Sequence, residues 1–473
     1  MRTFTLVCAV ALTASVLGAS GCSVINSFDD LKQEATAGAG GSGASGGTAG
    51  QGGSSGGGSG GAGATAGTGG SAGAGGSLIE PGLVVVAAEG TLTAGGRGLV
   101  VAALDPRTGE EFTRKEFGAN KNGFVAYDRE AGYWYVWTQE GGATDLYTFH
   151  VWTFNRSSGE FDEEGTASVP APAGVIAVLN KRVLYWSVYK EGASAPTQGF
   201  TVINVDNPQS PAPTTPLQDI PTFASPLAAI PRANGSDAGG SLNLFIKSST
   251  CAPDGVVDEN GSDVNMCEVQ RVRASLSASS PKPGYAGSPL VIGKVRQSGG
   301  SISAVEASND DAVAFPDPLW VKGVSTNTAG KVTRFNATNF NVNGSVNFEV
   351  GGSFIRGAAW DPCNKIYFAT ESLEELAIFA IPTGTTTGTP FRQSIGSVPV
   401  GAVFFDQYTR TLILPRGDQA NFELRAFLLG GDATSPTLTE RDANSSPPWD
   451  PPADLRPLQM EVETPAKQFC TSN

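Results

Sequence analysis

Short runs of apolar residues, separated by turn-forming residues, make up the chain from Leu78 onward. The runs are rich in Val, Ile, Phe, Tyr and Trp, and Gly, Pro, Asn, Asp and Ser lie between them. No long stretch carries the 3.6-residue apolar period of an amphipathic helix. The pattern therefore predicts an all-β domain over residues 78–473.

One phrase recurs along this domain: an apolar strand, a turn centred on Asp or Asn, and a second apolar strand. Two further strand-like runs follow each copy, which predicts a four-stranded unit that occurs six times. The six copies are GFVAYDREAGYWYVW (123–137), GVIAVLNKRVLYWSV (174–188), PLAAIPRANGSDAGGSLNLFI (226–246), SISAVEASNDDAVAF (301–315), IRGAAWDPCNKIYFA (355–369) and VGAVFFDQYTRTLIL (400–414).

The two ends of the domain are expected to supply a seventh unit. Strands at 83–88, 98–104 and 110–117 lack a first partner, and the apolar run around 458–462 supplies one. A ring closed by both chain ends has no exposed sheet edge. The folded part thus resembles a seven-bladed β-propeller of the broad YVTN/NHL-like kind. Six or eight blades, or a two-domain β protein, are the alternatives.

The first 21 residues have the pattern of an export signal. Arg2 precedes an apolar stretch at 4–17, and the small residues 19–21 lead to Cys22. Small residues before a cysteine resemble the lipobox of bacterial lipoproteins, although Ala19 stands where leucine is preferred. The resemblance implies that Cys22 is diacylated, which anchors the chain to a membrane, and Ser23 implies export to the outer membrane. An ordinary secretory signal with cleavage nearby is the alternative.

A tether is expected between this anchor and the domain. Residues 22–36 form the anchor segment, and residues 37–77 contain only Gly, Ala, Ser, Thr and one Gln. A segment without charges or large side chains cannot offset the entropy of ordering, so we expect a flexible linker with an r.m.s. span of about 35 Å. Such linkers resemble those of bacterial surface lipoproteins.

The composition excludes two classes of function. A net charge of −14 opposes binding to the phosphates of nucleic acids, so no nucleic-acid partner is expected. With one histidine in the chain, histidine-rich metal sites are excluded, and only His150 could act as a catalytic imidazole. Because His150 lies within the strand-like run LYTFHVWTF, we expect a packed or edge histidine and not a catalytic base.

Four cysteines remain once Cys8 leaves with the signal and Cys22 is lipidated. An even number in an oxidising compartment favours disulfides, of which three pairings can be drawn. The favoured pairing joins Cys251 to Cys267 across a polar loop and Cys363 to Cys470. In a propeller the second of these bridges would lock the ring closure.

The segment between Cys251 and Cys267 is also the one candidate metal site. It carries dense oxygen ligands suited to Ca²⁺, with Asp258, Asn260 and Asp263 as the weak candidates. The residue order of an EF-hand is absent, so a solvated loop without metal is favoured.

Two side chains are candidates for ligand binding. Arg356 interrupts a column of small or apolar residues on the strand nearest the expected channel, where it would bind a carboxylate or phosphate or pair with a neighbouring acid. Trp320 would stack on a sugar or peptide, or serve in packing as expected for Trp360. The turn residues Asp128, Asp361 and Asp406, with Asn180 and Asn309 at related places, are expected to cap their own turns.

No recognisable catalytic set is present, and no catalytic residue or cofactor is assigned. A nucleophile elbow, a phosphate loop and a dinucleotide fingerprint are all missing from suitable contexts. The leading hypothesis is a lipid-anchored envelope module that binds a protein or glycan ligand, or acts as a scaffold. The alternative is a glycosidase or lyase acting on envelope or extracellular polysaccharide, and a third reading is a structural spacer.

Overall fold

The computed structural model describes the chain from residue 82 to residue 465, with gaps. The described residues are 82–119, 121–139, 146–179, 181–189, 197–213, 223–232, 241–257, 262–275, 284–296, 311–316, 320–321, 331–336, 342–347, 355–361, 366–371, 375–379, 387–388, 391–394, 403–418, 421–431 and 435–465. The expected signal, anchor and tether at 1–77 therefore lie outside them, as do Cys363 and Cys470.

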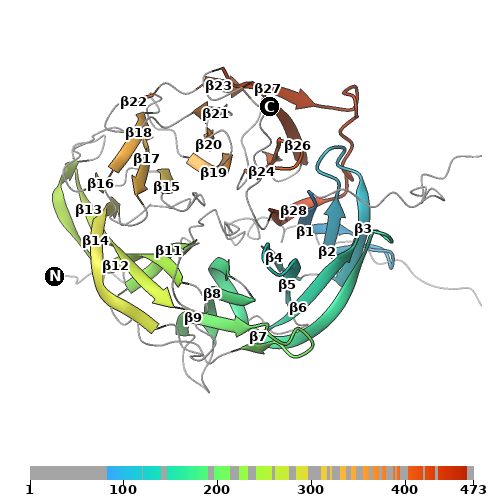
Figure 1. Ribbon diagram of the computed structural model, residues 1–473, viewed down its shortest axis with the longest axis horizontal. Helices are drawn as coiled ribbons and strands as arrows, with labels where there is room; N and C mark the ends of the chain where they lie inside the picture. The colour runs from blue at the N-terminus through green and yellow to red at the C-terminus, as the bar shows by residue number, and fades with distance from the viewer. Residues whose placement is uncertain are drawn as a thin grey trace, which may run out of the picture.

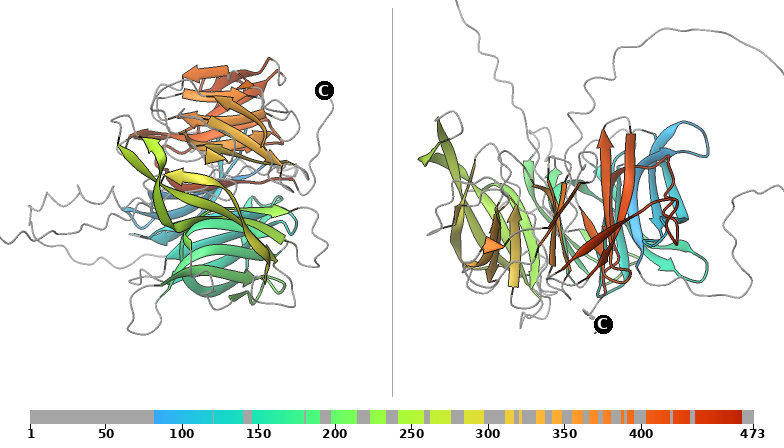
Figure 2. Two further views of the ribbon diagram at one scale, coloured as in Figure 1. Left: turned by 90° about the vertical axis from the view of Figure 1, so that its left-hand side faces the viewer. Right: turned by 90° about the horizontal axis from the view of Figure 1, so that it is seen from above.

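The described residues form β-sheets arranged around a ring (Figure 1). The first strand of each sheet lies near the centre of the ring, and the later strands lie further out. Seen from above, the strands run across the thickness of the ring (Figure 2). This arrangement is a β-propeller, so the all-β propeller expected from the repeats is confirmed. None of the described segments is a helix that could cross a membrane.

The strand order in each sheet follows the repeats. The first sheet runs β28 (Arg456–Val462), β1 (Val84–Thr91), β2 (Arg97–Leu104), β3 (Glu111–Gly118). The second contains β4 (Gly123–Asp128), β5 (Tyr133–Gln139), β6 (Leu146–Asn155), β7 (Glu160–Leu179), β8 (Arg182–Tyr189), β9 (Thr197–Asn204) and β10 (Ala212–Pro213). The third contains β11 (Phe223–Arg232), β12 (Ser241–Val257), β13 (Asp263–Ser275), β14 (Gly284–Arg296) and β16 (Trp320–Val321).

Three more sheets complete the ring. The fourth contains β15 (Asp311–Pro316), β17 (Lys331–Asn336), β18 (Val342–Asn347) and β22 (Thr387–Gly388). The fifth contains β19 (Ile355–Asp361), β20 (Ile366–Glu371), β21 (Glu375–Phe379) and β23 (Phe391–Ser394). The last contains β24 (Phe404–Asp406), β25 (Thr411–Asp418), β26 (Asn421–Gly430) and β27 (Thr437–Arg441).

The second sheet spans two consecutive repeats because β7 is long. Its first part pairs with β6 and its second part, from Ala171, pairs with β8. Divided at β7, the described strands form seven groups, while the blade number of the complete ring stays a prediction.

The C-terminal strand closes the ring, as the sequence predicts. β28 pairs antiparallel with β1, placing Val462 opposite Val84 and Met460 opposite Val86. The expected inner strand at 458–462 is therefore confirmed and begins two residues earlier. The first and the last strand of the described domain belong to the same sheet, so opening the ring requires breaking the pairing of β28 with β1.

The segment from Cys251 to Cys267 differs from the expected loop. Cys251 lies at the paired position opposite Cys267, in the antiparallel strands β12 and β13. The strands continue beyond this pair to Val257 and Asp263, so the polar-loop expectation is wrong for the described residues. A polar hairpin reads as a loop in sequence because its strands lack the apolar alternation that burial of one face imposes.

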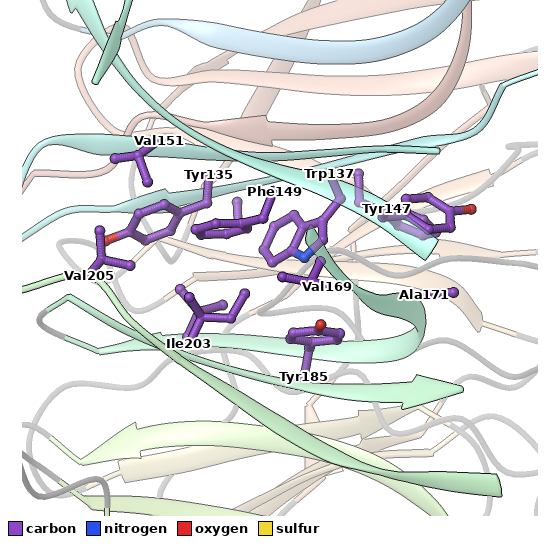
Figure 3. Close-up of a cluster of buried hydrophobic side chains, with 13 residues drawn as sticks. Tyr135, Trp137, Tyr147, Phe149, Val151, Val169, Ala171, Tyr185, Ile203 and Val205 are labelled. Carbon is purple, nitrogen blue, oxygen red and sulfur yellow. The ribbon is translucent and has the colours of Figure 1, made fainter. Parts of the chain in front are cut away.

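Aromatic side chains fill the space between neighbouring repeats (Figure 3). Ring centroids are 5.4 Å apart for Tyr135 and Phe149, and 5.0 Å apart for Trp137 and Phe149. Tyr185 of β8 meets the Trp137 edge at 5.7 Å. Tyr135 and Trp137 are two residues apart on β5, so their side chains lie on the same face of the sheet. Together with Phe149 of β6, they form the aromatic face that packs against β8.

Candidate functional site

The ligand-binding candidates from the sequence lie on strands at different places in the ring. Arg356 is the second residue of β19, the strand of its sheet nearest the centre in Figure 1. Trp320 begins β16, a two-residue strand that pairs with β14. The side chains of both lie outside the described part of the structure, so their proposed roles stay predictions.

The candidate calcium ligands are only partly described. Asp263 is exposed at the start of β13, and Asp258 and Asn260 fall outside the described residues. The described part of the chain holds no cluster of three His, Cys, Asp or Glu side chains suited to a metal. The structure joins Cys251 and Cys267 through their sulfur atoms.

The turn acids described in the repeats are buried, and the carboxylates of Asp128 and Asp406 accept hydrogen bonds. Asp128 is 1% exposed, and its Oδ1 accepts hydrogen bonds from the Glu130 and Ala131 main-chain N–H groups, both at 3.0 Å. Its Oδ2 accepts one from the Lys181 N–H at 2.7 Å, in the equivalent turn of the next repeat. The turn-capping interpretation is confirmed for this residue, which also ties neighbouring repeats together.

Asp406 repeats this arrangement in the last sheet. Its carboxylate accepts hydrogen bonds from the N–H groups of Tyr408 at 3.3 Å and Thr409 at 2.9 Å. Burial, followed by the negative charge of Glu463, raises its pKa to about 6 against the donors in its turn. Asp361 is also buried, at 2% exposure. A carboxyl with a raised pKa would suit a general acid, but Asp406 is 0% exposed and cannot meet a substrate.

Glu463 completes the ring closure and was not singled out from the sequence. It follows β28, near the position where three other repeats carry a turn Asp, and its Oε2 accepts the Gly82 N–H at 3.1 Å and the Leu83 N–H at 3.0 Å. Arg156, from the β6–β7 turn, forms an ion pair with the same carboxylate. Gly82 has φ +100°, and a Cβ there would lie 3.0 Å from Asp406 Oδ1, so glycine is required.

The single histidine belongs to a hydrogen-bonded chain between β5, β6 and β7. His150 Nδ1 lies 2.8 Å from Glu163 Oε2, and Nε2 lies 2.9 Å from Thr138 Oγ1. Trp152 Nε1 donates to the same glutamate oxygen at 3.2 Å. Burial lowers the pKa of His150 against the opposing effect of Glu163, so the imidazole is neutral at pH 7.

This chain has the order carboxylate, imidazole, hydroxyl that nucleophilic catalysis uses. However, Thr138 is 4% exposed and His150 is 8% exposed. Phe117 of β3 covers the imidazole, with ring centroids 5.5 Å apart. A buried hydroxyl cannot attack a substrate, so the expectation of a packed histidine is confirmed.

A cavity of about 490 Å³ beside the ring closure is a candidate site among the described residues. Arg97 and Arg456 of the first sheet line it, facing Arg425 and Arg441 of the last sheet. The connection at 442–455, which leads from β27 back to β28, completes the walls. The first and the last sheet lie side by side in Figure 1, where the end of the ring meets its beginning.

Trp449 and two prolines belong to the apolar part of this cavity. Trp449 is 6% exposed, packs in the core with Leu424 and Leu455, and donates its indole N–H to the Leu424 carbonyl at 2.9 Å. Pro451 and Pro452 are two of the wall residues. Proline fixes φ, so this part of the wall is stiff.

Carboxylates engage two of the four arginines. Arg97 pairs with Glu89 at 3.0 Å, and Arg425 pairs with Glu423 at 3.3 Å and with Glu440. Both are therefore largely neutralised.

The other two arginines have no carboxylate partner within the described residues. Arg441 donates to the main-chain carbonyl of Arg107, and burial lowers its pKa. Arg456 makes no side-chain hydrogen bond or ion pair to any described residue. Outside the ion pairs of Arg97 and Arg425, the lining holds Arg441 and Arg456 against Asp442, so it is positive in a chain of net charge −14.

Sequence reasoning missed this cavity because its residues share no motif. Arg97 and Arg456 are separated by most of the domain, and Arg425 and Arg441 lie on different strands. Only the pairing of β28 with β1 brings them together. The predicted C-terminal inner strand was the one available signal.

Comparison with known proteins yields distant structural matches. No family model and no curated protein matches the chain. A provisionally assigned 6-phosphogluconolactonase from Bacteroides uniformis is 14% identical and aligns over 81% of this chain and 100% of its own, with a TM-score of 0.46. A protein from Lactobacillus plantarum is 13% identical over 76% of this chain and 95% of its own, also with a TM-score of 0.46. Similarity at this level assigns no activity to the chain.

Proposed function

We propose that the chain is an exported, lipid-anchored β-propeller that binds a ligand at the cell envelope. The observation that carries the binding role is the cavity at the ring closure, with arginines, a tryptophan and prolines in its walls. A cavity of about 490 Å³ falls in the range of small-ligand sites. The anchoring role rests on the lipobox-like sequence ending at Cys22 and on the tether that follows it.

The environments of three buried acids and of the histidine favour binding over hydrolysis. A glycosidase needs two carboxyl groups that both reach the scissile bond. Asp128 and Asp406 are capped in their turns, and Glu463 is held by two main-chain N–H groups and Arg156. Each of these carboxylates stabilises the ring and lacks access to a substrate.

A screen against glycans and peptides tests the binding role. The full chain, purified in detergent, is incubated with each library, and bound ligands are recovered and compared with the input by mass spectrometry. Saturable binding with ligands recovered intact supports the proposal. Recovery of cleaved ligand supports the glycosidase or lyase alternative instead, and a screen without any binder contradicts the binding role.

The anchor is tested separately through Cys22. Cells that produce the chain are labelled with palmitate, and the membrane fraction is compared between wild type and Cys22→Ala. The expected result is labelled chain in the membrane fraction, and loss of both label and membrane association in the variant. Equal labelling of the two chains would contradict lipidation at Cys22.

A further inference from the structure

Arg456 and Arg441 give the cavity at the ring closure two cationic groups that form no ion pair with a described carboxylate. Arg456 sits at the start of β28, and Arg441 sits at the end of β27, on the other side of the connection that lines the cavity. Guanidinium groups bind carboxylates and phosphates with paired N–H donors. Two such groups lining one cavity would neutralise a single oxyanion.

The rest of the lining limits the size and shape of the ligand. About 490 Å³ accommodates a mono- or disaccharide, or a molecule of similar size. Pro451 and Pro452 offer an apolar wall, which suits the less polar face of a sugar ring. Asp442 on the same lining would repel a second negative charge on the ligand.

We infer that this cavity binds a compact saccharide-sized ligand carrying one carboxylate or phosphate group, with Arg456 and Arg441 holding the anion. The inference rests on the proposed binding function and names its ligand class. Both sugar acids and sugar phosphates carry such a group, and they are distinguished by the probes below.

Because the cavity walls come from the first and the last sheet, the ligand has a second effect. It contacts both sides of the ring closure at once and binds only when the ring is closed. A ligand that binds the folded state alone raises the unfolding temperature with its concentration. The cavity therefore couples ligand binding to the stability of the closed ring.

Isothermal titration calorimetry on the full chain in detergent tests the inference, with D-glucuronate, glucose 6-phosphate, inorganic phosphate and glucose as probes. We expect glucuronate, glucose 6-phosphate or both to bind, and glucose to bind at least tenfold more weakly. Binding should weaken at least tenfold in Arg456→Gln and in Arg441→Gln, because each variant loses one cation. The matched control is Arg129→Gln, which removes an arginine from the β4–β5 turn and should leave affinity unchanged.

Thermal unfolding of the same chains shows that a variant is folded and reports on the closed ring. The acidic probe that binds should raise the unfolding temperature of wild type and of Arg129→Gln, and should do so much less for Arg456→Gln. Arg456→Lys keeps the charge without the paired donors and should bind with intermediate affinity.

Other results overturn the inference in separable ways. Binding of inorganic phosphate alone, or equal affinity in Arg456→Gln, Arg441→Gln and wild type, would refute the assigned site. If neutral glycans or peptides bind and no acidic probe does, the ligand class is wrong while the binding function stands. If no ligand of either kind binds, both the inferred ligand class and the proposed binding function are refuted.

Discussion

Replacing Glu463 by glutamine tests whether the ring is held closed by this one buried carboxylate. Glutamine keeps the size of the side chain and one acceptor oxygen but removes the charge. The substitution weakens the acceptor of the Gly82 and Leu83 N–H groups, and it leaves Arg156 without its ionic partner.

The magnitude follows from the contacts. Each of the two main-chain hydrogen bonds becomes neutral, which costs about 1 kcal/mol apiece. The Arg156 side chain is 28% exposed, so losing its partner costs about 1 kcal/mol more, well below the value for a fully buried pair. A small gain opposes these losses, because Glu463 no longer raises the pKa of Asp406. The net expectation is a loss of about 2–3 kcal/mol in the free energy of unfolding.

Guanidinium unfolding followed by circular dichroism measures this loss. Glu110→Gln is the matched control, because Glu110 is exposed and its side chain makes no hydrogen bond or ion pair to a described residue. A double-mutant cycle with Arg156→Gln isolates the ion pair and should give a coupling of about 1 kcal/mol. Thermal melting is less sensitive, since a chain of this size shifts by only about 1–2 °C per kcal/mol.

The reasoning is refuted if Glu463→Gln unfolds within 0.5 kcal/mol of Glu110→Gln, a difference typical of surface substitutions (about ±0.5 kcal/mol). A stable variant would mean that β28 is held by strand pairing alone. Loss of stability with no coupling to Arg156 would restrict the effect to the two main-chain donors.

Three further results are expected. The His150 resonance, unique in a tag-free chain, should titrate below pH 6.5 in a proton NMR series, because burial lowers its pKa. Its contribution to stability is then present above pH 6.5 and is lost as the pH falls. Titration above pH 6.5 would contradict the buried site. Between pH 4 and about 6, folded Asp406 holds a proton that the unfolded chain has released, so the free energy of unfolding should fall by up to about 3 kcal/mol as pH rises through this window. Denaturation at several pH values should show a weaker dependence of the unfolding free energy on pH for Asp406→Asn than for wild type. Parallel curves for the two chains would contradict the raised pKa of Asp406. Cys251 and Cys267 should resist alkylation until a reductant is added, and replacing both by alanine should cost about 3 kcal/mol for a 16-residue separation. Free thiols in the unreduced chain would show that the bridge does not form.

Much of the fold could be predicted because its signals are local. The strand–turn–strand phrase at 123–137 becomes β4, its turn and β5, since alternating apolar positions and a turn-forming Asp act over a few residues. Asp128 caps its own turn for the same reason. The long hairpin of β12 and β13 was missed over 251–267 because its polar strands lack that alternation.

The candidate site could hardly be predicted at all. Glu463 looks like an ordinary acid near the end of a chain, and its partners Gly82 and Arg156 are hundreds of residues away. Arg456 and Arg441 carry no recognisable spacing. The sequence candidate Arg356 was chosen by its place in a repeat, and Trp320 by its residue type in an insertion; neither criterion indicates what surrounds the side chain.

The amino-acid sequence by itself determines the β-class of the domain, its repeats and the strand that completes the first sheet, because each depends on the short-range pattern of apolar and turn residues. Only the tertiary structure decides which charged side chains form ion pairs and which line the cavity without such a partner. Closing the ring brings β28 against β1, buries Glu463 with its partners, and leaves Arg456 and Arg441 in one cavity. Electrostatic and cavity properties depend on distances through space, and those distances are set only when the two ends of the domain meet.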